Sequence, residues 1–429
     1  MSGIVRLNEF SVIRHLAQIT LLFIAGVTPA LAQAPATGEV PQTREEVIAS
    51  ERADKVAELW PERQGGLVDF TNGLVERGLK EGLESGQGAN GVQLVLGGMR
   101  AAQGMSGGFG YRRSDLRRDQ LGIRGTARGT LQGAYMLDVE IDFQGVRTDR
   151  TFLNWYTKFE HSPQIDFFGT GNDSVEANRA SYRYDDFSSD FNAGFEPVRN
   201  FRIGATGGYF RPHTDLSGEE DLPPIDENFP AETLPGLGDD TDYTRIGLFA
   251  YFDSRDSQTG PRSGGLVGAR YREYWDTERK QFAFRQTELE IQKYLPYFNR
   301  SRVLAVRGMV VLSFPKEGNQ VPMYLQPTLG GSDDLRGFVP YRFTDYHAVK
   351  LSVEHRWYAM SFLDMALFGD AGKVVPLKRD VDVSGLHYSG GIGFRVRVRS
   401  AVVSRIDLAR SSEGFRLIWT FTDIFSPKF

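Results

Sequence analysis

The stretch Tyr135–Gln144, YMLDVEIDFQ, decides the fold class. Apolar side chains alternate there with carboxylates, in the order Leu137, Asp138, Val139, Glu140, Ile141, Asp142 and Phe143. Because successive side chains of an extended strand point to opposite faces, one face of this strand is apolar and the other is ionised. Such a strand cannot lie between two apolar layers, so it needs one apolar and one aqueous neighbour.

The same period of two recurs in about 16 segments between Val92 and Phe425. About 21 residues per strand plus connection suit membrane strands of roughly 9–11 residues. An even number of strands also lets the sheet close, so that no unpaired edge faces lipid. The pattern therefore predicts an all-β fold, a transmembrane antiparallel β-barrel of about 16 strands over residues 91–429. A soluble sandwich or propeller would need a shared apolar core, against which the charged faces argue.

The composition excludes several functions. The chain has 50 Lys+Arg against 55 Asp+Glu, a net charge of -5, so it is no globally basic nucleic-acid binder. It has no Cys, which excludes disulfides, thiolate metal sites and cysteine nucleophiles. The six His lack ligand spacing, and the Gly-rich stretch 104–110 precedes strands rather than a helix. We therefore expect no enzyme activity, no cofactor and no metal site.

The N-terminal residues predict export. Arg6 and Arg14 precede an apolar run, residues 16–27, and a small-x-small triplet, Ala30-Leu31-Ala32, follows. This pattern is typical of a secretory signal peptide, residues 1–32, cleaved after Ala32. Residues 33–90 are polar and carry two helical patterns, which predicts a short, partly helical periplasmic extension.

The connections between strands alternate in length, as expected when short turns face the periplasm and long loops face outward. The longest of these loops, residues 212–243, contains ten acidic residues, five prolines and no Lys or Arg. One interpretation is a solvated extracellular loop. The other is a segment that binds Ca²⁺ or Mg²⁺ and thereby bridges to anionic lipopolysaccharide.

Several motifs carry a resemblance to one family. Residues 330–338 read GGSDDLRGF, and the chain resembles the BamA/TamA-like bacterial surface antigen barrels, whose sixth outer loop carries a hydrophobic-Arg-Gly-aromatic motif. Further motifs in the order of this family lie at 167–172, 253–256 with Pro261 and Gly264, 368–374, 391–395 and 405–409. Members usually carry periplasmic POTRA domains, and the segment 33–90 is shorter than one, so the resemblance is to a member without them.

The alternation by itself assigns Glu354 and Asp370 to the inward faces of neighbouring strands. A guanidinium group can bind two carboxylates through its fork of donors. In the family the corresponding arginine clamps the loop inside the barrel against two such acids. The resemblance thus implies a structural loop clamp formed by Arg336, Gly337, Phe338, Glu354 and Asp370. The alternative is a set of unrelated charges in the lumen.

The resemblance implies a protein of the Gram-negative outer membrane that assists protein insertion or translocation there. A weak seam between the first and last strands would open to lipid or pair with a client strand. The expected partners are outer-membrane lipid, lipopolysaccharide and unfolded outer-membrane or secreted proteins, with no nucleic acid. Two alternatives stay open, namely a passive pore or structural surface antigen without insertase activity, and a secretion pore for a separately encoded partner.

Overall fold

The computed structural model describes residues 90–97, 99–100, 103–145, 148–216, 222, 224–360, 362–398 and 401–421. All described residues lie within the unit Trp60–Phe429. The predicted signal peptide, its cleavage after Ala32 and the predicted extension up to residue 89 lie outside the described residues. These assignments stay predictions.

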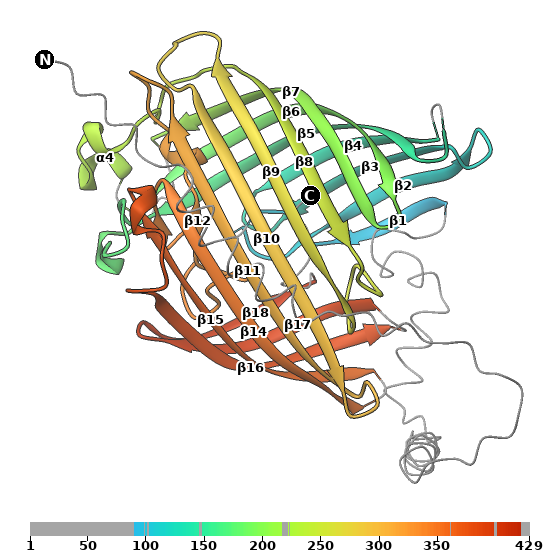
Figure 1. Ribbon diagram of the computed structural model, residues 1–429. Helices are drawn as coiled ribbons and strands as arrows, with labels where there is room; N and C mark the ends of the chain where they lie inside the picture. The colour runs from blue at the N-terminus through green and yellow to red at the C-terminus, as the bar shows by residue number, and fades with distance from the viewer. Residues whose placement is uncertain are drawn as a thin grey trace, which may run out of the picture. The chain divides into compact units, whose positions relative to one another are not determined.

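One antiparallel sheet of 16 strands accounts for most of the described residues, which confirms the predicted fold (Figure 1). Each strand pairs with its neighbours along the chain, and only the small pair β12 and β13 stands apart. The strands are β1 Gly91–Leu96, β2 Ser106–Leu116, β3 Leu121–Thr130, β4 Tyr135–Gln144, β5 Thr151–Phe167, β6 Ala180–Val198, β7 Phe201–Asp215, β8 Tyr243–Asp253, β9 Gly264–Asp276, β10 Phe284–Tyr297, β11 Arg302–Pro315, β12 Thr328–Leu329, β13 Phe343–Thr344, β14 His347–Met360, β15 Leu363–Val375, β16 His387–Val398, β17 Ala401–Ser411 and β18 Gly414–Thr420.

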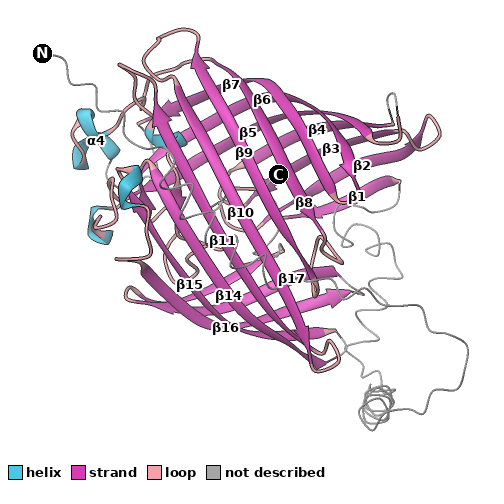
Figure 2. Ribbon diagram, viewed as in Figure 1, coloured by secondary structure: helices cyan, strands magenta, loops and turns pink. Residues whose placement is uncertain are grey.

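The two ends of the sheet differ. One end carries short turns such as Arg199-Asn200 between β6 and β7, and the other carries the long loops. Figure 2 shows the short helices gathered at the long-loop end. They are α4 Ile225–Asn228 and the 3-10 helices Glu176–Asn178, Ala231–Thr233, Met323–Leu325 and Lys378–Asp380. Short turns face the periplasm in outer-membrane barrels, so the long loops form the extracellular end. β7 extends to Asp215 and so includes the first residues of the loop predicted over 212–243.

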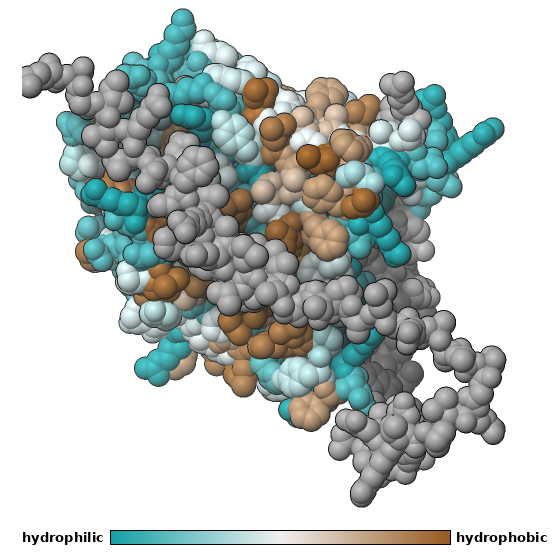
Figure 3. All heavy atoms as spheres, in the orientation of Figure 1, coloured by the Kyte–Doolittle hydropathy of each residue, from teal (hydrophilic) through white to brown (hydrophobic). Residues whose placement is uncertain are grey.

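The polarity of the sheet is the reverse of that of a water-soluble protein. On β14 the side chain of Val353 is 45% exposed, whereas Ser352 and Glu354 on either side are 4% and 0% exposed. Exposed apolar residues thus form the outer face, and buried charges fill the interior. Figure 3 shows hydrophobic residues gathered over the strands and hydrophilic ones toward the ends. An apolar outer band around a polar interior is the requirement for a barrel in lipid.

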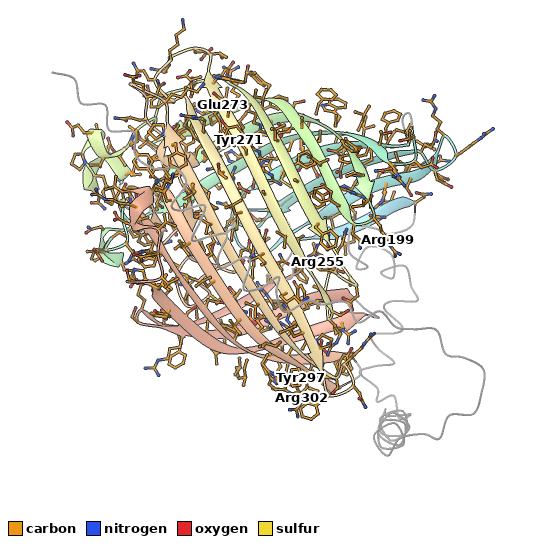
Figure 4. All side chains as sticks on the ribbon, in the orientation of Figure 1. Arg199, Arg255, Tyr271, Glu273, Tyr297 and Arg302 are labelled. Atoms are coloured by element: carbon orange, nitrogen blue, oxygen red, sulfur yellow. The ribbon has the colours of Figure 1, made fainter. Side chains whose placement is uncertain are left out.

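Aromatic residues lie near both ends of the strands, as membrane-interface girdles require. Figure 4 places Tyr271 at the extracellular end and Tyr297 at the periplasmic end. Tyr274 and Tyr294, which also lie near strand ends, are only 5% and 1% exposed and therefore face the interior. No helix in the described part of the chain is long and apolar enough to cross a membrane.

Candidate functional site

The connection between β11 and β14, residues 316–346, turns into the interior of the sheet. Three side chains of the loop motif are at most 1% exposed although they belong to a loop, namely Leu335, Arg336 and Phe338. Gly330 starts the inward turn with φ +114°, and a Cβ there would lie 2.1 Å from the carbonyl oxygen of Val339. Only glycine fits this conformation and this close approach.

The structure brings Arg336 together with both predicted carboxylates. Its Nε and Nη2 donate to the two carboxylate oxygens of Asp370 at 2.8 and 2.7 Å, and its Nη1 donates to Glu354 at 2.5 Å. The guanidinium carbon also lies 3.4 Å from the centroid of the Phe368 ring. All three charged side chains are fully buried. A bidentate bond and a stacked aromatic ring fix the plane of the guanidinium group, so it can reach the second acid.

The site is larger than the sequence analysis predicted. Asp407 on β17 lies 3.4 Å from Arg336 Nη1 and accepts a hydrogen bond from Arg395 at 2.6 Å. Arg395 also donates to Glu354 at 2.8 Å. We call the whole set the arginine network, with the members Arg336, Glu354, Arg356, Asp370, Arg395, Arg405 and Asp407. The network joins β14, β15, β16 and β17 to the inward loop.

The alternation of charged and apolar residues could have revealed the network members that the sequence analysis did not name. Arg395 and Asp407 lie within the stretches 391–395 and 405–409 that carried the family resemblance, and both alternate with apolar neighbours. Their inward direction could therefore be read from the sequence. Their meeting with Glu354 could not, because it depends on the strand register, in which Asp407 pairs with Gly393. The absent side chain of Gly393 leaves the space that the Arg395 and Asp407 side chains fill.

Gly337 and Phe338 hold the rest of the loop tip. A Cβ at Gly337 would lie 2.7 Å from the Cβ atoms of Ser389 and Ser411, so glycine lets the loop backbone touch β16 and β17. Ser411 Oγ donates to the carbonyl oxygen of Gly337 at 2.8 Å. Phe338 packs edge-on against Phe343, with ring centroids 5.3 Å apart, within a buried apolar cluster. The loop tip thus has an ionic and an apolar anchor.

The loop between β5 and β6 braces the inward loop from the extracellular side. The N–H of Gly171 donates to the carbonyl oxygen of Thr344 at 2.8 Å, and Arg342 donates to the carbonyl oxygen of Ser174 at 2.7 Å. Asn172 accepts a hydrogen bond from the N–H of Val374 on β15 at 3.2 Å. The motif at 167–172 therefore ties distant strands together across the extracellular end.

A buried carboxyl lies where the inward loop returns to the wall. Asp345 is 1% exposed and accepts a hydrogen bond from the N–H of Tyr346 at 2.7 Å. Burial raises the pKa of Asp345 to about 6, because the ionised carboxylate loses its hydration, and the hydrogen bond offsets only part of this loss.

The acidic loop is packed rather than merely solvated. Ile225 and Leu234 are 0% and 5% exposed and belong to an apolar cluster with Ile165, Phe167 and Met323. The N–H of Met323 on the inward loop donates to Pro235 O at 2.9 Å. The apolar side chains of the loop are thus packed, while its acidic residues Asp226, Glu227 and Glu232 stay exposed. In the described ranges, no group of three His, Asp or Glu side chains is placed to hold a metal ion.

The family follows from a comparison with protein-family models. The Omp85 superfamily domain matches residues 122–409, which is about two thirds of the chain and includes the inward loop and all of β14 to β16. The chain belongs to the Omp85 superfamily. This membership assigns it to the outer membrane of a Gram-negative bacterium and confirms the family resemblance of the sequence. Among curated protein sequences, no relative was found.

Solved structures agree on the fold of this Omp85 barrel. BamA from Haemophilus ducreyi lacking POTRA domains 1–3 superposes with a TM-score of 0.57 at 14% identity, covering 78% of this chain and 71% of that one. CdiB from Escherichia coli superposes with a TM-score of 0.50 at 11% identity, covering 76% of this chain and 61% of CdiB. The chain thus spans about three fifths of CdiB, and at these identities the likeness concerns the fold alone.

Proposed function

We propose that this Omp85 barrel assists the insertion of proteins into the outer membrane, or their translocation across it, without bond chemistry. The observation that carries the proposal is the position of the last strand in the arginine network, β17, directly beside the end strand β18. The network ties β14 to β17 into one braced wall, one strand before β18. β18 and β1 stand at the two ends of the strand order and, with 7 and 6 residues, are the shortest of the described strands of this sheet.

Short end strands beside a braced wall suit a seam that accepts a client strand. An end strand presents backbone N–H and C=O groups along one edge, and an extended client segment can pair with that edge. β18 and β1 make few backbone hydrogen bonds because they are short. Exchanging these bonds for bonds to a client strand costs less free energy than opening a longer pairing such as that of β5 with β6. Unfolded outer-membrane or secreted proteins are the proposed clients, and lipid with lipopolysaccharide surrounds the barrel.

In this proposal the five residues Arg336, Gly337, Phe338, Glu354 and Asp370 act as a structural clamp. The clamp keeps residues 316–346 inside the barrel, so that the wall next to β18 stays rigid while the seam changes. The ion pairs of Arg336 support this role because they link the loop to two strands at once. Arg245, which pairs with Asp190 on the opposite side of the sheet, offers a matched luminal arginine outside the clamp.

The test is depletion of the protein, followed by quantification of outer-membrane proteins. Insertase activity predicts the loss of a defined set of these proteins, restored by the wild-type and Arg245→Ala chains but not by Arg336→Ala. A client trapped by photo-crosslinking from Phe415 on β18 would identify the seam as the site. An unchanged outer-membrane proteome, together with large steady conductance of the purified barrel, would favour the passive pore. Loss of one secreted protein alone would favour the secretion pore.

A further inference from the structure

The connection between β8 and β9, residues 254–263, is the longest turn in the described part of the periplasmic end, and we call it the periplasmic strap. It follows Asp253 at the end of β8 and contains most of the motif of Asp253 to Asp256 with Pro261, for which the proposed function has no role. Figure 4 places Arg255 at the same end of the sheet as Tyr297 and Arg302. Asp256 shapes the strap by accepting hydrogen bonds from the N–H groups of Arg262 and Ser263 at 2.9 and 3.2 Å.

The strap reaches far beyond its own strands. The carbonyl oxygen of Thr259 accepts a hydrogen bond of 2.7 Å from the N–H of Val402 on β17. Five strands, β10, β11, β14, β15 and β16, separate β9 from β17 in the sheet. A turn of ten residues cannot follow the wall over that distance, so this contact runs across the periplasmic end of the barrel.

Arg262 is the main side-chain anchor of the strap on the far wall. Its Nη1 donates to Asp364 on β15 at 2.9 Å, and its Nη2 donates to the carbonyl oxygens of Arg300 and Ser301 at 3.1 and 3.0 Å. Its guanidinium carbon lies 3.7 Å from the centroid of the Tyr358 ring. One side chain therefore joins the strap to three neighbouring segments.

These contacts can be broken at low cost. Asp364 also pairs with Arg397 at 3.5 Å, so the carboxylate keeps a cationic partner when Arg262 leaves. Ser254, Asp256 and Gln258 on the strap are exposed, and water can replace the polar contacts of an exposed segment. Pro261 is the buried apolar residue of the strap, whereas Phe338 of the inward loop lies in a cluster of six buried apolar residues.

We propose that the periplasmic strap is a gate over the periplasmic entrance of the lumen, and that Arg262 holds it shut. When Arg262 parts from Asp364, the strap swings away from β14, β15 and β17 and the interior opens to the periplasm. The gate is independent of which proteins the barrel handles, so it stands or falls separately from the insertase proposal.

The absence of Cys from the chain allows a direct test with one reporter thiol. Ala366 is 1% exposed and lies two residues beyond Asp364 on the same inward face of β15. In the full-length Ala366→Cys protein in outer membranes, a polyethylene glycol maleimide should react slowly. Adding Arg262→Gln or Asp364→Asn should accelerate labelling about tenfold, the effect of losing roughly one hydrogen-bonded ion pair. Arg150→Gln is the matched control, because the Arg150 side chain donates to the carbonyl oxygen of Pro197 at 3.1 Å, in a turn outside the strap.

Two further measurements complete the test: the side of the membrane from which the maleimide enters, and the coupling between Arg262 and Asp364. The acceleration should occur in opened membranes and not on intact cells, where the reagent meets only the extracellular end. The double variant Arg262→Gln/Asp364→Asn should label no faster than the faster single variant, because both changes break one contact. Retained heat-modifiability shows that a variant is folded. One folded single variant, either Arg262→Gln or Asp364→Asn, is enough to test the gate. Unchanged labelling in the folded variants, or equal acceleration on intact cells, would overturn the gate.

Discussion

Arg336 and Asp370 are joined by two parallel hydrogen bonds, Nε to Oδ2 at 2.8 Å and Nη2 to Oδ1 at 2.7 Å, although all of β14 lies between them in the sequence. Both side chains are fully buried, so neither has water as a substitute partner. The pair therefore holds the loop only while both partners are present. Removing one partner leaves the other charge uncompensated in the interior.

Arg336→Ala should be the most damaging single charge deletion in the barrel. It leaves Asp370 and Glu354 without their shared cation and should lower the free energy of unfolding by roughly 3–5 kcal/mol. Urea unfolding followed by tryptophan fluorescence measures this change. Arg336→Lys should recover only part of the loss, because an ammonium group cannot form the two-pronged bond. Arg245→Ala, which breaks one less buried pair, should cost less. Equal losses at Arg336 and Arg245 would contradict a special role for the network.

Gly337→Ala should loosen the loop without removing any charge. The new Cβ would lie 2.7 Å from Ser389 and Ser411, so the loop must move away from the wall, at a cost of about 1–3 kcal/mol. Limited proteolysis of the folded barrel should then cut within residues 316–346. Gly369→Ala on β15 is the matched control, because its Cβ would meet nothing closer than 4.0 Å. Resistance of the Gly337→Ala loop to proteases would show that the wall gives way instead.

The outer face should reject charge more strongly than the inner face at the same depth. Leu248 on β8 is 63% exposed toward lipid, whereas Thr206, one position away on the paired strand β7, faces the interior. Leu248→Lys should cost roughly 2–4 kcal/mol, and Thr206→Lys should cost less because the lumen is polar. Folding into lipid vesicles, read by heat-modifiability, compares the two. Similar yields for both variants would contradict the assignment of faces.

The inward loop should lose stability as the pH rises through the pKa of Asp345. Its folded pKa of about 6 lies above the usual value of roughly 4, so the proton binds more tightly when the loop is folded. The extra stability is present below about pH 4 and is lost by about pH 6. We expect a change on the order of 2–3 kcal/mol, because the folded pKa lies about two units above the usual one.

Urea unfolding between pH 4 and pH 8 measures this dependence. Asp345→Asn, which cannot ionise, should flatten this part of the profile and should match the wild type at low pH. A wild-type stability that rises across pH 4–6, or an Asn variant with the same slope as the wild type, would contradict the assignment to Asp345.

The sequence allowed the ion pairs of Arg336 to be predicted only in part. Glu354 and Asp370 could be assigned to inward faces because each lies in an alternating strand, and Arg336 because its motif resembled a known loop. Arg395 shows the limit, since alternation gave its direction but not its partners. The packing of Ile225, a residue of the acidic loop itself, was not predicted, because neither interpretation of the ten acidic residues included apolar packing.

Alternation of apolar and ionised residues by itself determined that this chain forms membrane strands with a polar interior. That property is local, because consecutive side chains of a strand point to opposite faces whatever the rest of the chain does. Only the tertiary structure decided which interior charges meet, how residues 316–346 lie against β16 and β17, and that Arg262 reaches Asp364 across the periplasmic end. Those contacts join segments far apart in sequence, and they depend on strand register, sheet curvature and loop paths, for which no short-range pattern exists.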